Sequence, residues 1–214
     1  IDGNRSGLVA SEAEAATAVS IRLAASTDAG TDPQERALRR IGLPVAKYWV
    51  CKRAGGVVGE ALECLGGNGY VEESGMPRLY REAPLNSIWE GAGNVNALDV
   101  VRALRRQPAA MDAYLREVGA ASGADRYLDH AVKDLLQSLA DLDAVDAGAR
   151  RLVERMALVL QASLLVRFAP AAVADAFCAS RLGQDWGYAY GTLPRRLDHL
   201  ALISRAFPAD PARG

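Results

Sequence analysis

Apolar residues recur at helical spacing from the start of the chain. Residues 8–26 carry one apolar stripe, formed by Leu8, Ala15, Val19, Ile21 and Leu23. This spacing predicts a helix. A second helix is predicted over Gln34–Leu65, because Asp32 is a capping residue and Pro33 is tolerated in a first turn. Pro44 removes one backbone donor inside this helix, and we expect a kink there.

The same pattern predicts helices through the rest of the chain. The expected ranges are Gly93–Arg106 (or from Asn86), Ala110–Val118, Ala124–Leu142, Val145–Leu182 and Leu193–Phe207. Pro170 should bend the longest of these near Phe168. Residues 68–85 are expected to form a loop, because Pro77 and Pro84 interrupt them. No strand alternation of useful length occurs, so the predicted fold class is all-α.

A boundary between two helical units is predicted after Gln107. Pro108 and the Gly/Ser-rich end of residues 107–123 interrupt the helical pattern. Residues 1–107 would form one unit and residues 108–214 the other. The chain begins without an initiator Met, and from Leu8 onward its apolar pattern is that of the middle of a helix. We therefore expect a piece of a longer protein.

Composition supports packed helices and argues against some functions. Half of the residues are hydrophobic but only 6% are aromatic, and the many Ala and Leu residues favour closely packed helices. The net charge of −1 gives no general attraction to nucleic acid or anionic lipid. No run reaches the roughly 20 apolar residues of a membrane span. Cys51, Cys64 and Cys178 form no metal-binding pattern, and we expect reduced thiols in a cytoplasmic protein.

Glu90 is the clearest candidate for acid–base chemistry. It lies between Trp89 and Gly91. A carboxylate beside an indole can lie against an apolar pocket, where the loss of water makes it a stronger base. The alternative is a solvated carboxylate at the start of a helix, where it complements the helix dipole. Both interpretations remain open, and spacing alone favours the second.

A glycine-rich stretch, Gly66-Gly67-Asn68-Gly69-Tyr70, follows the long predicted helix. Its glycines either end that helix or allow another chain or a cofactor to approach closely. The stretch lacks the preceding strand and the following helix of a dinucleotide-binding phosphate loop. Taken alone, it favours a structural turn.

Together, these motifs resemble a segment of the acyl-CoA dehydrogenases. That family carries Gln-x-x-Gly-Gly-x-Gly-aromatic, then an Arg-Asp pair, then aromatic-Glu-Gly-Thr-x-Gln. The corresponding residues here, in the same order and spacing, are Glu63, Gly66, Gly67, Gly69, Tyr70, Arg81-Glu82 and Trp89-Glu90-Gly91-Ala92-Gly93-Asn94. The sequences PRLYRE, NSIWEG and GNVNALDVVRAL are similar to the AidB-like branch, which is associated with the response to DNA alkylation. The resemblance implies the C-terminal helical bundle of the family, followed by a helical extension.

The resemblance implies a protein that binds FAD and dehydrogenates an acyl-CoA thioester between its alpha and beta carbons. Glu90 matches the catalytic base, which takes the alpha proton while a hydride leaves the beta carbon. The residues matched to the cofactor are Glu63, Gly66, Gly67, Gly91 and Asn94, and the glycine pair is expected to meet the FAD of a neighbouring subunit. Two residues depart from the pattern. Glu63 brings a negative charge toward the pyrophosphate unless a cation or water intervenes, and Ala92 lacks a hydroxyl.

The resemblance also implies that parts of the enzyme are missing. The N-terminal helical domain and the middle β domain of the family, which meet at the flavin and the thioester, have no counterpart in these residues. We therefore expect the isolated chain to be inactive and to retain no FAD. Bundles of this kind form tetramer cores in the family, so we expect a homo-oligomer, either a dimer or a tetramer.

Arginines in the C-terminal half make double-stranded DNA an alternative ligand. Clustered arginines can neutralise phosphates, and the candidates are Arg150, Arg151, Arg155, Arg195 and Arg196. Aromatic residues that could stack on bases follow at Trp186, Tyr188 and Tyr190. The competing interpretation is a solvated helix face with acidic partners, together with aromatic rings that fix a loop to its own domain. The residues favour this second interpretation.

Overall fold

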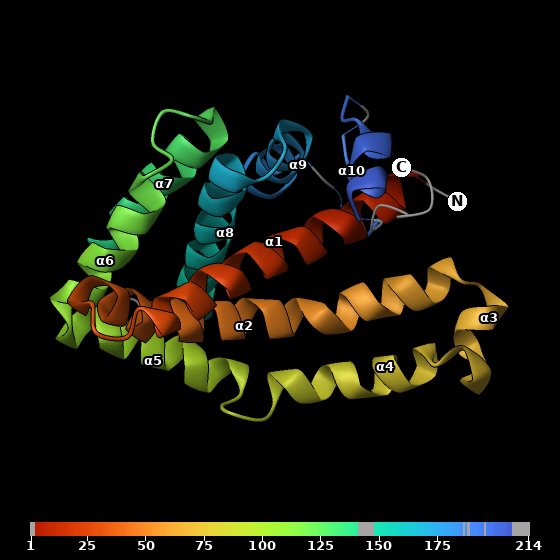
Figure 1. Ribbon diagram of the computed structural model, residues 1–214, viewed down its shortest axis with the longest axis horizontal. Helices are drawn as coiled ribbons and strands as arrows, with labels where there is room; N and C mark the ends of the chain where they lie inside the picture. Colours follow the sequence, from red (N-terminus) through yellow and green to blue (C-terminus); the bar gives the residue numbers. More distant parts are fainter. Residues whose placement is uncertain (1–2, 141–147, 186, 188, 195, 207–214) are drawn as a thin grey trace.

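The computed structural model describes residues 3–140, 148–185, 187, 189–194 and 196–206. Within these ranges every regular element is a helix, and the helices pack into one elongated bundle (Figure 1). This confirms the predicted all-α fold class. None of the helices in these ranges is both long and apolar enough to cross a membrane.

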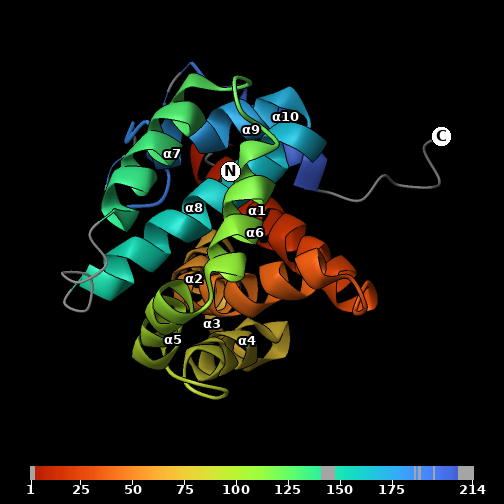
Figure 2. The same cartoon turned by 90° about the vertical axis from the view of Figure 1, so that its left-hand side faces the viewer.

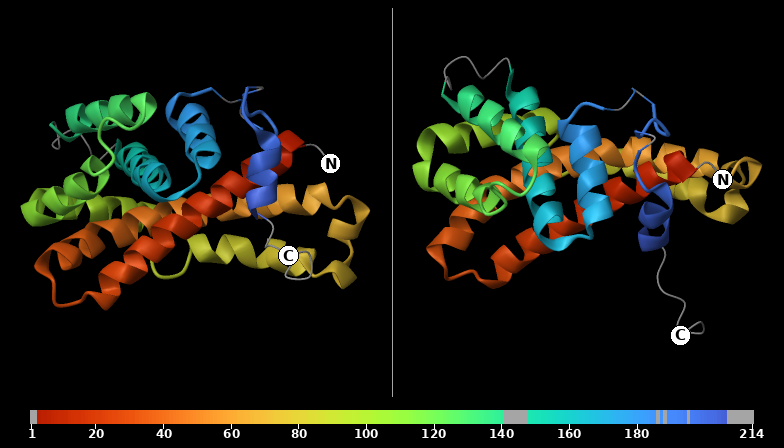
Figure 3. Two further views of the ribbon diagram at one scale, coloured as in Figure 1. Left: turned by 45° about the horizontal axis from the view of Figure 1, so that its top comes forward. Right: turned by 90° about the horizontal axis from the view of Figure 1, so that it is seen from above.

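Two long helices, α1 (Gly3–Asp28) and α2 (Pro33–Cys64), lie side by side along the bundle (Figures 1 and 3). Asp32 caps α2 by accepting a hydrogen bond from the Gln34 amide at 2.7 Å, as the sequence predicts. The helix continues through Pro44. Gly42 allows the pair to pack closely, because a Cβ there would lie 2.6 Å from Leu23 Cδ2.

Residues 68–85, which the sequence analysis predicts to be a loop, are mostly helical. They contain α3 (Gly67–Tyr70), η1 (Glu72–Ser74), α4 (Met76–Glu82) and the start of η2 (Ala83–Ser87). The prediction was wrong because Pro77 and Pro84 lie in the first turns of α4 and η2. A backbone amide in a first turn has no acceptor within its helix, so proline there costs no hydrogen bond. This segment returns alongside α2 (Figure 1).

The next four helices are α5 (Gly93–Arg106), α6 (Pro108–Gly119), α7 (Arg126–Leu139) and α8 (Ala149–Phe168). The first three lie within a few residues of their predicted ranges. The predicted end at Leu142 and the predicted start at Val145 fall outside the described residues. Figure 2 shows α7 beside α8, with α2 below them.

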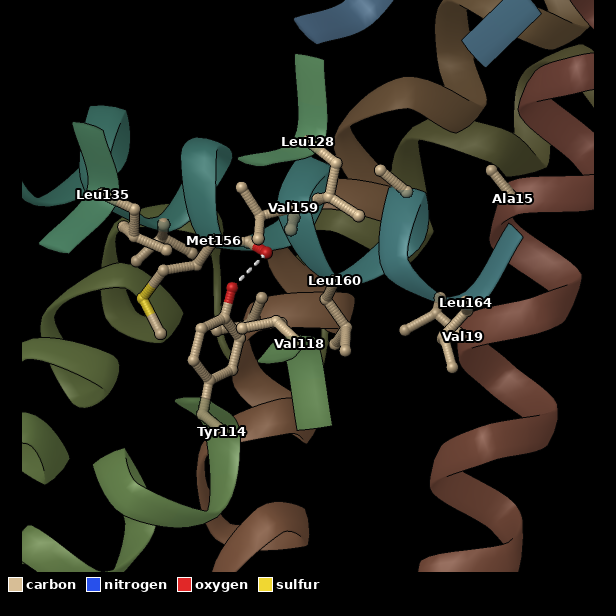
Figure 4. Packing of buried hydrophobic residues seen from close by; sticks show 14 of the residues in the cluster. Ala15, Val19, Tyr114, Val118, Leu128, Leu135, Met156, Val159, Leu160 and Leu164 are labelled. Atoms are coloured by element: carbon tan, nitrogen blue, oxygen red, sulfur yellow. Dashed lines mark hydrogen bonds between the residues drawn. The ribbon is translucent and has the colours of Figure 1, made fainter. Parts of the chain in front are cut away.

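The centre of the core is α8. Its buried side chains lie on all sides of the helix, which is typical of a helix surrounded by others. Tyr114 is fully buried, and its hydroxyl donates a hydrogen bond to the Met156 carbonyl at 2.7 Å (Figure 4). Burial raises the pKa of Tyr114 well above its ordinary value. Helices on both sides of Gln107 contribute to this core, and the division of the chain there stays a prediction.

The C-terminal part bends at Pro170, as predicted. α8 ends at Phe168, and α9 (Ala171–Phe177) starts after Pro170 and passes into a π-helix, η4 (Cys178–Leu182). The last helix, α10, covers His199–Ala206. It begins later than the predicted Leu193, because Asp198 accepts a hydrogen bond from the Ala201 amide at 2.9 Å and so caps the helix. The predicted end at Phe207 lies outside the described residues.

Candidate functional site

Glu90 lies in a tight turn between η2 and α5. Its φ is 57°, and Gly91 follows with a φ of 99°. A residue with a side chain adopts this left-handed conformation at a cost of about 1 kcal/mol or more, and such residues cluster at functional sites. The Glu90 side chain is exposed. The turn therefore leaves the carboxylate at the surface of the described part of the chain.

Neighbouring side chains hold the Glu90 turn in place. Asn96 Nδ2 donates a hydrogen bond to the Gly91 carbonyl at 2.6 Å, and Lys47 Nζ donates one to the Asn86 carbonyl. A Cβ at Gly93 would lie 2.8 Å from Lys52 Cε, so the start of α5 packs tightly on α2. Asn96 could not be predicted as a site residue, since nothing in its spacing distinguishes it from a surface asparagine.

Many large apolar side chains near this turn are exposed. Ile88 and Trp89 are 63% and 56% exposed. Others follow on α3 to α5 and the links between them, and we call the whole set the apolar surface: Tyr70, Val71, Leu79, Tyr80, Leu85, Ile88, Trp89, Val95 and Leu98. Exposed apolar surface on this scale is typical of regions that bind another protein surface or a ligand.

The glycine turn lies at the end of α2. Gly66 has a φ of 59°, which favours glycine. Gly69 is needed for packing, because a Cβ there would lie 2.1 Å from the Leu62 carbonyl oxygen. Gly67 has neither a left-handed backbone nor any atom that a Cβ would meet within 4 Å. Nothing in the described part of the chain requires glycine at position 67.

The charge of Glu63 is offset within the chain. Arg5 Nη2 lies 3.0 Å from Glu63 Oε1, and Arg5 Nε lies 2.6 Å from Glu60 Oε1. Arg5 belongs to α1, far from Glu63 in sequence, so no local sequence signal predicts this contact. The guanidinium supplies a cation at the position where the sequence analysis found an unfavourable negative charge.

The two parts of the predicted site lie at different points along α2. The glycine turn packs near Leu62, whereas the start of α5 packs on Tyr48 and Lys52. At 1.5 Å per residue, these contacts are roughly 15–20 Å apart. Figure 1 shows α3 at one end of the returning segment and the loop before α5 at its other end. The described residues therefore do not bring Glu90 and the glycine turn into one pocket.

A groove of about 900 Å³ lies beside the glycine turn, lined in part by Glu63, Gly66 and Tyr80. Arg81 and Glu72 form an ion pair at 2.8 Å along it. The hydrogen bond from Arg81 holds the pKa of Glu72 below its ordinary value. In the described part of the chain, His, Cys, Asp and Glu nowhere form a cluster suited to a metal ion.

Three of the five candidate DNA-binding arginines lie together. Arg150, Arg151 and Arg155 line one pocket between α2, α7 and α8. Arg196 is instead paired with Asp185 at 2.9 Å. Arg195, Trp186 and Tyr188 lie outside the described residues. Tyr190 accepts a hydrogen bond from Arg53 Nη2 at 2.9 Å, which ties its loop to α2.

The fold is that of an all-helical domain whose exposed apolar surface carries a strained carboxylate turn. Residues 4–105 match the family "Acyl-CoA dehydrogenase, C-terminal domain". This part of the chain belongs to the acyl-CoA dehydrogenase family, as its motifs predict.

Two relatives extend this result. Over 179 residues, or 84% of its length, the chain is 41% identical to AidB of Escherichia coli K12, whose name assigns it to the acyl-CoA dehydrogenases. The predicted similarity to the AidB-like branch is thus confirmed. Over 82 residues, or 38% of its length, it is 43% identical to acyl-CoA dehydrogenase family member 11 of Caenorhabditis elegans. The chain covers 33% of the first relative and 13% of the second.

Solved structures share the fold. Caenorhabditis elegans ACDH-11 in complex with C11-CoA matches 80% of this chain with a TM-score of 0.68 and 25% identity, and the match covers 34% of the ACDH-11 chain. The apo form of Bd2924 also matches 80% of this chain, with a TM-score of 0.63 and 24% identity, over 32% of its own length. Both matches support the helical architecture.

Proposed function

We propose that this chain contributes the catalytic base, Glu90, to an FAD-dependent acyl-CoA dehydrogenase. The observation that carries the proposal is the Glu90 turn, in which two successive left-handed residues project a carboxylate beside exposed Ile88 and Trp89. If the rest of the enzyme covers the apolar surface, this carboxylate lies in a dry site. A carboxylate in such a site is suited to taking a proton from carbon.

In the complete site, Glu90 takes the proton from the carbon alpha to the thioester carbonyl. The FAD, when bound, supplies the acceptor for the hydride from the beta carbon. Asn96 positions Glu90 through the Gly91 carbonyl, and Trp89 helps to exclude water. Ala92 begins α5 without a side-chain cap, so it supplies no hydroxyl to cofactor or substrate.

The residues assigned to FAD fit a cofactor at the surface of the chain. Gly66 and Gly67 present open backbone, and the ion pair with Arg5 reduces the repulsion between Glu63 and a pyrophosphate. Gly91 and Asn94 lie beside Glu90 at the start of α5. The two groups are roughly 15–20 Å apart along α2. Following the family resemblance, we assign the glycine turn to the cofactor of a neighbouring subunit, which requires a homo-oligomer.

An acyl-CoA thioester is the proposed substrate. ACDH-11, which shares the fold over 80% of this chain, is described in complex with C11-CoA. Since the chain spans a third of the E. coli relative, the isolated chain is proposed to be inactive and to lose FAD. Its three free cysteines suit a cytoplasmic protein. DNA binding is the less favoured function. Arg196 is paired with Asp185, and Arg150, Arg151 and Arg155 line a pocket rather than an open face.

The test is a chimera in which this chain replaces the matching third of the E. coli relative. Purified with FAD, it should bleach on addition of butyryl-CoA or isovaleryl-CoA under anaerobic conditions. Glu90→Gln should keep the flavin and slow bleaching at least about 100-fold. Asp112→Asn, which changes an exposed carboxylate on α6 without an ion-pair partner among the described residues, is the matched control. Equal bleaching by both variants would refute the assignment of Glu90.

A further inference from the structure

A second candidate site lies where α2, inside the matched family domain, meets the part of the chain that follows that domain. A pocket of about 780 Å³ lies where α2, α7, α8 and η4 meet, a size typical of small-molecule sites. Two acidic side chains line it, Asp134 and Glu154. They are outnumbered by the basic side chains, which are Lys52, Arg53, Arg150, Arg151, Arg155 and Arg181. The pocket is therefore suited to an anion.

Two of the cations have no partner of their own. Neither Lys52 nor Arg151 has a hydrogen bond or an ion pair within the described ranges, and both are exposed. Arg53 and Arg181 are held from behind, since both form ion pairs with Glu12. The pocket therefore combines two arginines, Arg53 and Arg181, that Glu12 holds in place with two exposed cations, Lys52 and Arg151, that have no ion-pair partner among the described residues.

The pocket also has an aromatic wall. Tyr48 accepts a hydrogen bond from Arg150 Nε at 3.3 Å, and Arg53 lies 5.7 Å from the ring centre of Trp49. The Trp49 Nε1 atom is buried and has no acceptor in the described part of the chain. Buried indole donors usually find a partner, so an acceptor on a ligand would satisfy a donor that the described residues leave unpaired.

The backbone around the pocket is also unusual. η4, which carries Arg181, is a π-helix, and short π-helical segments are frequent at functional sites. Gln184 lines the pocket with a φ of 56°. A strained, non-glycine residue beside convergent cations is expected where the backbone is adapted to a ligand.

We propose that this pocket binds a small organic anion that carries a diphosphate and an aromatic base, such as a nucleoside diphosphate. The diphosphate pairs with Lys52, Arg151 and Arg155, and the base lies along the exposed part of Trp49. Double-stranded DNA fits the geometry less well. Arg181 is only 8% exposed, so a duplex, which needs cations along an open face, does not reach it.

Calorimetric titration of the 214-residue chain with ADP, pyrophosphate, adenosine and a duplex of about 20 base pairs tests this, at about 50 mM salt. We expect ADP to bind more tightly than pyrophosphate and adenosine not to bind. Lys52→Ala and Arg151→Ala should each weaken ADP binding about tenfold, because each removes a charge-assisted hydrogen bond. Trp49→Phe, which removes the indole donor, should weaken it severalfold.

Arg36→Ala is the matched control. Arg36 is exposed, is unpaired in the described structure and lies roughly 18 Å along α2 from Tyr48, the nearest pocket residue on that helix. It should leave ADP binding unchanged. Unchanged far-UV circular dichroism would show that each variant folds. The proposal is overturned if ADP does not bind, if Arg36→Ala weakens ADP binding as much as Arg151→Ala, or if the duplex binds more tightly than ADP and is weakened by the same variants. None of these readouts depends on dehydrogenase activity.

Discussion

Replacing Glu117 should destabilise the bundle strongly and in a pH-dependent way. This carboxylate on α6 lies 2.7 Å from Arg22 on α1 and 2.7 Å from Arg167 on α8. Arg22 also pairs with Glu35 on α2 at 2.8 Å. The Glu117 side chain is 9% exposed, and the partly exposed cluster around it ties four helices together.

The magnitude follows from two charge-assisted hydrogen bonds. Each contributes roughly 1.5–3 kcal/mol when buried. Arg22 keeps Glu35 as a partner, and both arginines are partly exposed, which reduces the loss. We therefore expect Glu117→Gln to lower the free energy of unfolding by about 2 kcal/mol near neutral pH.

The pH dependence has a definite sign. Burial alone would raise the pKa of Glu117, but the hydrogen bonds from Arg22 and Arg167 outweigh it and lower the pKa below the ordinary 4.5. A carboxyl with a lowered pKa in the folded state stabilises the protein above its unfolded pKa, and this contribution is lost as the pH falls through the folded value. The difference between wild type and Glu117→Gln should therefore shrink in acid.

Urea unfolding followed by far-UV circular dichroism, at about pH 7 and about pH 3, measures both effects. Glu73→Gln, at an exposed carboxylate without a described ion-pair partner, should change little at either pH. A loss at Glu117→Gln below about 0.5 kcal/mol, or a loss equal at both pH values, would refute the reasoning.

Three further predictions concern the candidate site. Glu90→Gly should be more stable than Glu90→Ala by about 1 kcal/mol in thermal unfolding, because only glycine adopts the left-handed turn without strain; equal stability would contradict the strain. Gly69→Ala should cost about 1–3 kcal/mol through its clash with Leu62, whereas Gly67→Ala should leave the isolated chain no less stable and weaken FAD retention in the chimera. In light scattering, the average mass of the isolated chain should rise with protein concentration, and Trp89→Gln should lower it at a given concentration. A strict monomer at high concentration would argue against an uncovered apolar surface.

Local signals allowed much of the fold to be predicted. Asp32 and Pro33 marked the start of α2 correctly, and Pro170 marked the break after α8. The same kind of signal misled at Pro77 and Pro84, because a proline interrupts a helix only beyond its first turn. The start of α10 was missed because Asp198, rather than the apolar pattern, sets it.

The candidate site was predictable only in part. Glu90 and the glycine turn are contiguous motifs, so the sequence indicated them directly. Contacts between distant segments carry no such signal, and the ion pair of Arg5 with Glu63 is one example. The pocket beside Trp49 is another, because α2, α7, α8 and η4 form it only after the chain has folded.

The most direct test of the central claim isolates proton removal at Glu90 from hydride transfer. The chimera is incubated in deuterium oxide with an acyl-CoA analogue that has sulfur in place of the beta carbon, so no hydride can leave. Deuterium should enter the alpha carbon while the flavin stays oxidised, and Glu90→Gln should slow this exchange at least about 100-fold. Exchange at the same rate in wild type and Glu90→Gln would show that another group is the base.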